Sequence, residues 1–111
     1  MKLITAIVRP EKLGELIEVL AGSGARGLTV TDVRGFGQQL GQLAGRPVLP
    51  GAALLPKIRL DVVALDDDAE LLVEAIAKHA RTETIGDGKI WMTPVDSVLR
   101  VRTGERDRAA V

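Results

Sequence analysis

Short segments rich in β-branched residues alternate along this chain with two longer segments of helical periodicity. Residues 2–8 are short, β-branched and apolar, and residues 56–64 alternate charged with apolar side chains. Both patterns predict strands, the second with one solvated face. Residues 11–21 and 69–80 have apolar side chains every three or four positions, which predicts two amphipathic helices. Further strands are predicted at residues 27–36, 89–94 and 99–102.

The order of these elements is strand, helix, strand, long loop, strand, helix, strand. This is the split βαβ pattern of an α+β, ferredoxin-like βαββαβ sandwich, here with a short C-terminal strand. Helices are expected on one face of the sheet, and an uncovered apolar face would be an interaction surface. We therefore expect one domain over residues 1–111 and self-association of the chain.

Helix boundaries show ordinary signals. Arg9-Pro10 ends the first strand, and residues 22–24 (Gly-Ser-Gly) stop the first helix. The three aspartates at 66–68 suit an N-cap and the positive end of the second helix. A metal site at these aspartates, or one at His79, is the alternative. The charged tail, 103–111, is expected to be frayed.

The segment from 38 to 55 departs from both periodicities. It has three glycines, two prolines and a single charge, Arg46. A structureless segment of this length in a small domain indicates either function or disorder. Its leucines argue against a purely solvated connector.

Composition excludes several classes of protein. The chain has 111 residues with 15 Lys+Arg against 15 Asp+Glu, so it lacks the basic surplus of a general nucleic-acid binder. It has no cysteine, which excludes disulfides and thiolate metal sites. No apolar run reaches the ~20 residues of a membrane span, and charges near the N-terminus argue against a signal peptide. These features predict a cytoplasmic protein that does not insert into a membrane.

The stretch Gly86-Asp87-Gly88-Lys89 is the candidate chemical motif. Glycines permit a sharp turn, and consecutive amides in such a turn can form a concave nest for anions. Lys89 would add a positive charge for a phosphate. The alternative is an ordinary turn between helix and strand with a solvated lysine.

Several blocks in the right order resemble the PII family of nitrogen and carbon signal proteins. Residues 1–10 resemble its opening strand, and residues 27–37 its second strand and loop entry. Residues 55–59 resemble the loop exit, residues 80–91 the C-terminal signature, and residues 98–105 the segment that follows.

The resemblance implies a homotrimer of ferredoxin-like subunits that binds ATP or ADP in the clefts between neighbours. A mobile loop, the T-loop at about 37–56, would contact a target transporter, enzyme or regulator. In many members Mg²⁺ and ATP also recruit 2-oxoglutarate. The nucleotide-binding loop would span about 82–89.

Site residues carry over by position. Gly86, Asp87, Gly88 and Lys89 match the phosphate loop, and Arg100 and Arg102 match arginines that reach the phosphates from the adjoining subunit. Gly35 and Gly37 match backbone positions near the nucleotide, Thr29 and Val63 match the adenine pocket, and Asp61 stands where a glutamate is usual. Gln39 matches the side chain that helps hold Mg²⁺ and 2-oxoglutarate, and Lys57 the basic residue near that acid.

The departures gather in the loop. Gln38 replaces the usual arginine, which leaves the preference between ATP and ADP open. The chain has no tyrosine, and no serine or threonine lies between residues 37 and 56, so the known kinds of loop modification have no acceptor. The partner-binding residues predicted here are Leu43, Arg46, Val48 and Leu49.

The leading interpretation is a non-enzymatic sensor, in which nucleotide occupancy changes the conformation of the T-loop. There are three alternatives. One is a PII-like carbon, bicarbonate or transport sensor that does not respond to 2-oxoglutarate, and another is a trimeric adaptor that binds no ligand. A small hydrolase on the same fold is a third, although the sequence offers no Ser–His–Asp set.

Overall fold

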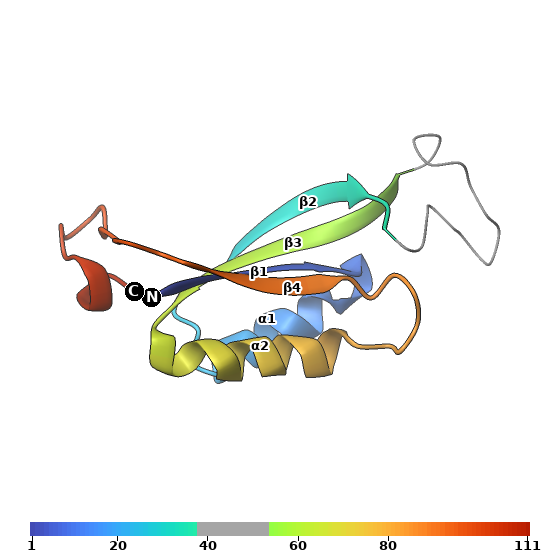
Figure 1. Cartoon of the computed structure of the whole chain (residues 1–111), viewed down its shortest axis with the longest axis horizontal. Helices are drawn as coiled ribbons and strands as arrows, with labels where there is room; N and C mark the ends of the chain where they lie inside the picture. The colour runs from blue at the N-terminus through green and yellow to red at the C-terminus, as the bar shows by residue number, and fades with distance from the viewer. Residues whose placement is uncertain (38–53) are drawn as a thin grey trace.

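The chain folds as a two-layer α/β sandwich (Figure 1). This computed structural model describes residues 1–37 and 54–111. The strands are β1 (Lys2–Val8), β2 (Thr29–Gly35), β3 (Leu55–Ala64) and β4 (Lys89–Pro94). The helices are α1 (Leu13–Gly22), which follows a 3₁₀ turn at Pro10–Lys12, and α2 (Asp66–Ala80). The order confirms the predicted ferredoxin-like arrangement.

The four strands form one antiparallel sheet in the order β2-β3-β1-β4. Both helices lie on the same side of this sheet (Figure 1). The register places Ile4 opposite Val62 on β3 and Met92 on β4, so apolar side chains from three strands face the helices together. Because side chains alternate across a strand, a slip of one residue would move this whole set to the other face.

The core lies between the sheet and the two helices. Ile4, Leu16 and Ile76 have no exposed surface, and they come from β1, α1 and α2 respectively. The helical periodicity of the two amphipathic segments is what directs these side chains inward. The other members of the core are Ala6, Val8, Leu20, Ile58, Leu60, Val62, Ala64, Ala69, Leu72 and Ala80.

The sheet face away from the helices is mixed in character. Asp61 accepts hydrogen bonds from the Thr5 hydroxyl at 2.8 Å and from Arg59 Nε at 2.9 Å. Thr5 is buried, whereas the Trp91 side chain on the same face is half exposed. Neither α1 nor α2 covers this face of the sheet (Figure 1).

The start of α2 differs in detail from the prediction, whereas its end at Ala80 is as predicted. Leu65, with an extended backbone, is the N-cap, so the three aspartates lie in the first turn and not at the cap. Asp66 pairs with the N-terminal ammonium at 2.9 Å, and His79 Nδ1 lies 2.8 Å from Glu15 on α1. No group of three His, Asp or Glu side chains in residues 1–37 and 54–111 could hold a metal ion.

The C-terminal segment is a hairpin. The predicted strand at 99–102 is reduced to one bridge, Leu99 with Arg106, and the segment then makes a 3₁₀ turn at Asp107–Ala109. Gly104 adopts φ 72°, and its amide donates to the Arg100 carbonyl at 2.8 Å. The expectation of a frayed tail is wrong, because these hydrogen bonds close the chain on itself.

Over the described part of the chain, no helix has the length and apolar character to cross a membrane.

Adjacent leucines on α2 test this packing. Leu72 is 1% exposed and Leu71 is 64% exposed. We expect Leu72→Ala to lower the free energy of unfolding by about 2–5 kcal/mol, because it leaves a cavity in the core. Leu71→Ala, the matched control, is expected to change it by less than about 0.5 kcal/mol. Urea denaturation at fixed protein concentration measures both, and equal losses would contradict the orientation of α2.

Candidate functional site

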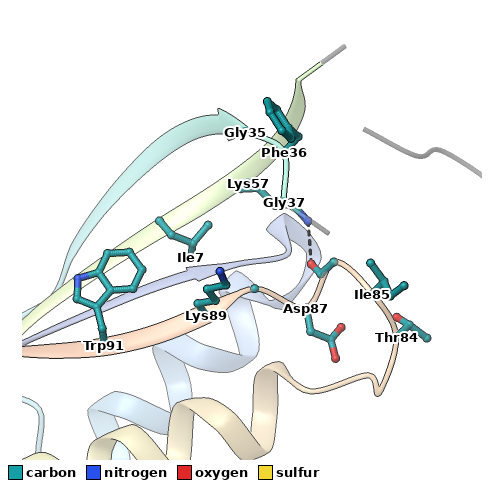
Figure 2. A pocket seen from close by; sticks show the side chains of 12 residues that line it. Ile7, Gly35, Phe36, Gly37, Lys57, Thr84, Ile85, Asp87, Lys89 and Trp91 are labelled. Atoms are coloured by element: carbon teal, nitrogen blue, oxygen red, sulfur yellow. Dashed lines mark hydrogen bonds between the residues drawn. The ribbon is translucent and has the colours of Figure 1, made fainter. Parts of the chain in front are cut away.

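A cavity opens where the loop after α2 meets the end of the sheet. Its volume is about 370 Å³. Figure 2 shows that all four strands or their flanking residues contribute to it. The lining residues are Ile7, Gly35, Phe36, Gly37, Lys57, Thr84, Ile85, Gly86, Asp87, Gly88, Lys89 and Trp91.

Asp87 folds the loop around its own carboxylate. Its oxygens accept hydrogen bonds from the amides of Thr82 at 2.7 Å and Glu83 at 2.8 Å, and from the Thr82 hydroxyl. Burial raises the pKa of this carboxyl, but the hydrogen bonds from Thr82, Arg9 and Glu83 outweigh it and hold the pKa well below its usual range. The carboxylate is therefore ionised near neutral pH, and its lone pairs are used inside the loop.

Two glycines permit the backbone path of the loop. Gly86 has φ 105° and Gly88 has φ 99°, both in the left-handed region. A Cβ at Gly88 would lie 1.7 Å from the Ile7 carbonyl oxygen of β1. Only glycine lets the loop cross β1 at this point.

Two cations tie the loop to the sheet. Arg9, just after β1, donates from Nε to Asp87 at 3.0 Å and from Nη2 to the Ile85 carbonyl at 2.8 Å. Lys57 of β3 donates from Nζ to the Gly86 carbonyl at 2.8 Å (Figure 2). Desolvation and the nearby Arg9 charge lower the pKa of Lys57. The two successive carbonyls are thus held by Arg9, which follows β1, and by Lys57 in β3.

Lys89 is the cation that the loop presents to the cavity. It is the first residue of β4, and its side chain points into the open space in Figure 2. It is exposed, and it forms no ion pair with any side chain in the described ranges. Trp91 follows two positions later on the same face of the strand and gives the cavity an apolar wall. A positive end beside an apolar wall suits a ligand with an anionic group and a flat apolar part.

Comparison with known proteins decides the family. The family model described as nitrogen regulatory protein P-II matches residues 1–105. The chain is 47% identical to nitrogen regulatory protein P-II of Cereibacter sphaeroides over an alignment of 115 positions, which covers both chains fully. It is 43% identical over 112 residues to nitrogen regulatory protein GlnK of Escherichia coli K12, again over the full length of both. The chain belongs to the P-II family.

A third relative gives the same result. Nitrogen regulatory protein P-II 2 of Methanothermobacter thermautotrophicus is 48% identical over 114 residues, covering all of this chain and 97% of that protein. The resemblance inferred from the sequence blocks is confirmed.

The cavity at the end of the sheet brings together one group of the predicted site residues. Gly35, Gly37, Lys57 and the run 86–89 all line it. Gln38, Gln39, Leu43, Arg46, Val48 and Leu49 lie outside the described residues. Thr29, Asp61 and Val63 are not among the residues that line the cavity. Thr29 pairs with Asp61 across β2 and β3, farther along the uncovered sheet face.

Arg100 and Arg102 lie at the other end of the molecule. β4 carries the chain away from Lys89 for about 17 Å before Pro94, at the usual rise per residue, and the C-terminal hairpin lies beyond it (Figure 1). Arg100 pairs there with Glu105 at 3.0 Å. Residues 101–103 form a turn, so the two arginines do not lie on one continuous strand as the predicted strand at 99–102 would require. Within one chain these arginines cannot reach Lys89.

Sequence reasoning missed Arg9 and the apolar lining of the cavity. From the sequence, Arg9 is only part of the Arg-Pro pair that ends the first strand. Its loop contacts join residues 75–78 positions apart, which no local pattern reveals. Trp91 and Ile7 could have been found from strand alternation, because each lies on the face of a predicted strand that the helices leave uncovered. Phe36, Thr84 and Ile85 were the other missed lining residues.

Replacement of Gly88 tests the close crossing of β1. Gly88→Ala is expected to lower the free energy of unfolding by about 1–3 kcal/mol, since the left-handed backbone and the Ile7 carbonyl both oppose a Cβ. The control, Gly14→Ala, places its Cβ in open space on α1 and is expected to stabilise by up to about 1 kcal/mol. Denaturant unfolding measures both, and a neutral Gly88→Ala would contradict the loop geometry.

Acid titration tests the role of Asp87. A carboxyl with a lowered folded pKa stabilises fully above its unfolded pKa, about 3.9, and loses that contribution as the pH falls. We expect wild type to be more stable than Asp87→Asn at pH 7, with the gap constant down to about pH 5. Below about pH 4 the gap should shrink with each further drop. A gap that stays constant down to pH 2.5, measured by urea unfolding, would show that Asp87 does not hold the loop.

Proposed function

We propose that this chain is a signal-transduction regulator of nitrogen metabolism that binds ATP or ADP in clefts between three copies. Nucleotide occupancy would set the conformation of the segment at about 37–56, and a transporter, enzyme or regulator would recognise that conformation. Membership of the P-II family supports the regulatory role. The proposal assigns no catalytic step to the chain.

One observation carries the sensing part of this proposal. The cavity is lined on one side by the glycine loop with Lys89, and on the other by Gly35–Gly37 and Lys57. The latter residues flank the segment 38–53 before and after it in the chain. A molecule in the cavity therefore contacts both roots of that segment. A ligand that contacts the roots differently in two arrangements can shift the balance between them by that difference in affinity.

The cavity suits an adenine nucleotide. Its volume of about 370 Å³ lies in the range of small-molecule sites. Trp91 and Ile7 supply apolar contact for a base, while Lys89 supplies a charge for a phosphate. One lysine is a small counter-charge for a polyphosphate, so further cations are needed, and Arg100 and Arg102 of the same chain are too far away.

A neighbouring copy would complete the site. In the proposed assembly, a head-to-tail contact that closes after three copies would bring the C-terminal hairpin of one chain beside the loop of the next. The same contact would cover the sheet face that the helices leave open. In that assembly each cleft combines Lys89 from one chain with Arg100 and Arg102 from another.

The distribution of charge between the two layers favours anion capture at the sheet end. Helices α1 and α2 carry seven of the fifteen acidic residues and only one of the fifteen lysines and arginines. The strands, loops and hairpin therefore carry a positive excess although the net charge is zero. Such a separation raises the local concentration of anions near the basic side and speeds their encounter.

The proposal includes a second ligand, 2-oxoglutarate with Mg²⁺, and Gln39 and Lys57 are the two residues that would bind it. Gln39 lies outside the described residues. Lys57 donates to the Gly86 carbonyl, so an acid at this position would have to compete with that carbonyl for the ammonium group. Titration of 2-oxoglutarate with Mg²⁺ and ATP present separates this sensor from one that ignores the acid.

Calorimetry with ATP, ADP, AMP and cyclic AMP tests the proposal. We expect ATP or ADP to bind with a Kd well below the millimolar range, and Lys89→Gln to weaken binding at least about tenfold by removing a charge-assisted contact. Lys78→Gln, on the outer side of α2, is the matched control and should bind as wild type does. Absence of binding to any of the four nucleotides would reject the nucleotide sensor and favour the adaptor.

Mixed oligomers test whether the site is shared. Lys89→Gln and Arg100→Gln should each lose affinity alone. When the two variants are unfolded, mixed in equal amounts and refolded, about a quarter of the clefts should join an intact loop to an intact arginine. We therefore expect about a quarter of the clefts in the mixture to bind nucleotide with wild-type affinity. No recovery in mixtures that do form mixed oligomers would contradict a cleft shared between copies.

A further inference from the structure

The loop that lines the cavity does not hold its position by its own contacts alone. Glu83, Gly86 and Gly88 all have positive φ, and the loop is neither helix nor strand. Asp87 closes the loop internally, but those bonds do not connect it to the sheet. Among the described residues, Arg9 donates three hydrogen bonds to the loop, and Lys57 donates to the Gly86 carbonyl.

Arg9 occupies a fixed position between β1 and Pro10. A residue before proline is restricted to extended backbone, and Arg9 has φ −66° and ψ 138°. Its side chain is 18% exposed. Its planar guanidinium donates to Asp87, to the Thr84 hydroxyl at 2.9 Å and to the Ile85 carbonyl. One rigid group thus binds a carboxylate, a hydroxyl and a carbonyl of the loop at once, which a lysine cannot reproduce.

These contacts also set the direction of the loop amides. The peptide bond is planar, so a carbonyl held in place fixes the amide of the following residue. Arg9 holds the Ile85 carbonyl and Lys57 holds the Gly86 carbonyl, which fixes the amides of Gly86 and Asp87. Arg9 itself is absent from the described residues that line the cavity. Its direct contacts are therefore with the loop and not with the cavity.

We propose that Arg9 is a positioning residue that sets nucleotide affinity by holding the 82–88 loop in its binding arrangement without contacting the ligand. This inference rests on the proposed nucleotide site. If only a fraction of the molecules has the binding arrangement, the apparent Kd rises by the inverse of that fraction. A loop released to other arrangements for about nine-tenths of the time would bind about tenfold more weakly.

The test compares Arg9→Lys and Arg9→Gln with Arg26→Lys, which makes the same replacement at an exposed arginine outside the cavity and the loop. We expect both Arg9 variants to bind ATP about tenfold more weakly than wild type, within about twofold of each other. Amide exchange at residues 82–88 of the ligand-free protein should be faster in both variants. Arg26→Lys should match wild type in affinity and in exchange. Thermal unfolding and the oligomeric state show whether each variant is folded and assembled.

A double-mutant cycle gives a readout that a general loss of stability would not produce. If Arg9 acts through the loop, Arg9→Gln added to Asp87→Asn should cost little further affinity. Additive losses would overturn the inference. Recovery of wild-type affinity in Arg9→Lys would also overturn it, because that result assigns Arg9 a charge effect on the ligand.

The two proposals fail in different ways. If wild type binds ATP and Arg9→Lys binds it equally well, the positioning role falls and the nucleotide site stands. If wild type binds no nucleotide, the proposed function and the effect of Arg9 on affinity both fall. Amide exchange would then still decide whether Arg9 holds the loop, and unchanged exchange would reject that as well.

Discussion

The site depends on the contact between the Gly88 backbone and the Ile7 carbonyl of β1. Any side chain at position 88 would collide with that carbonyl, so the loop lies on the sheet at van der Waals distance. The next residue, Lys89, starts β4 and pairs with Ile7 in the sheet register. The position of the cavity's cation is therefore fixed by the same contact that lets the loop cross β1. The glycine that packing requires is therefore followed directly in the sequence by the lysine that faces the cavity.

The uncovered face of the same sheet bears on the proposed assembly. The helices bury one face, and the other carries a row in which Thr5, Asp61 and Arg59 satisfy each other beside exposed apolar groups. A polar row that is already hydrogen-bonded can be covered without leaving unpaired groups. In the proposed assembly, covering this face and completing the site would be one event. Folding, assembly and ligand binding would then stabilise one another.

The sequence predicted the elements of the fold, which depend on local periodicity. It did not predict the features that depend on contacts between residues far apart in the chain. Two amphipathic segments and four β-rich ones sufficed for the fold, because apolar spacing dictates which face of each element is buried. The glycine run was recognisable as a turn with special backbone demands, and Lys89 as its cation. Arg9 was not recognisable, since its partners lie more than seventy positions away. The C-terminal hairpin was also missed, because strand propensity at residues 99–102 gave way to a turn closed by Gly104.

The hairpin arginine illustrates how the charge balance can tune such a site. Arg100 pairs with Glu105 across its own turn, and both side chains are substantially exposed. An exposed ion pair contributes little, about 0–1 kcal/mol, so a phosphate could replace the carboxylate at small cost. The pair orients the guanidinium before a ligand arrives, and it leaves a negative charge nearby afterwards. In the proposed cleft that residual charge would oppose every anionic ligand, and would oppose it more strongly the more negative charge the ligand carries. In the proposed shared cleft, Glu105 would thus lower the affinity of any anion that does not gain enough from Lys89 and the hairpin arginines together.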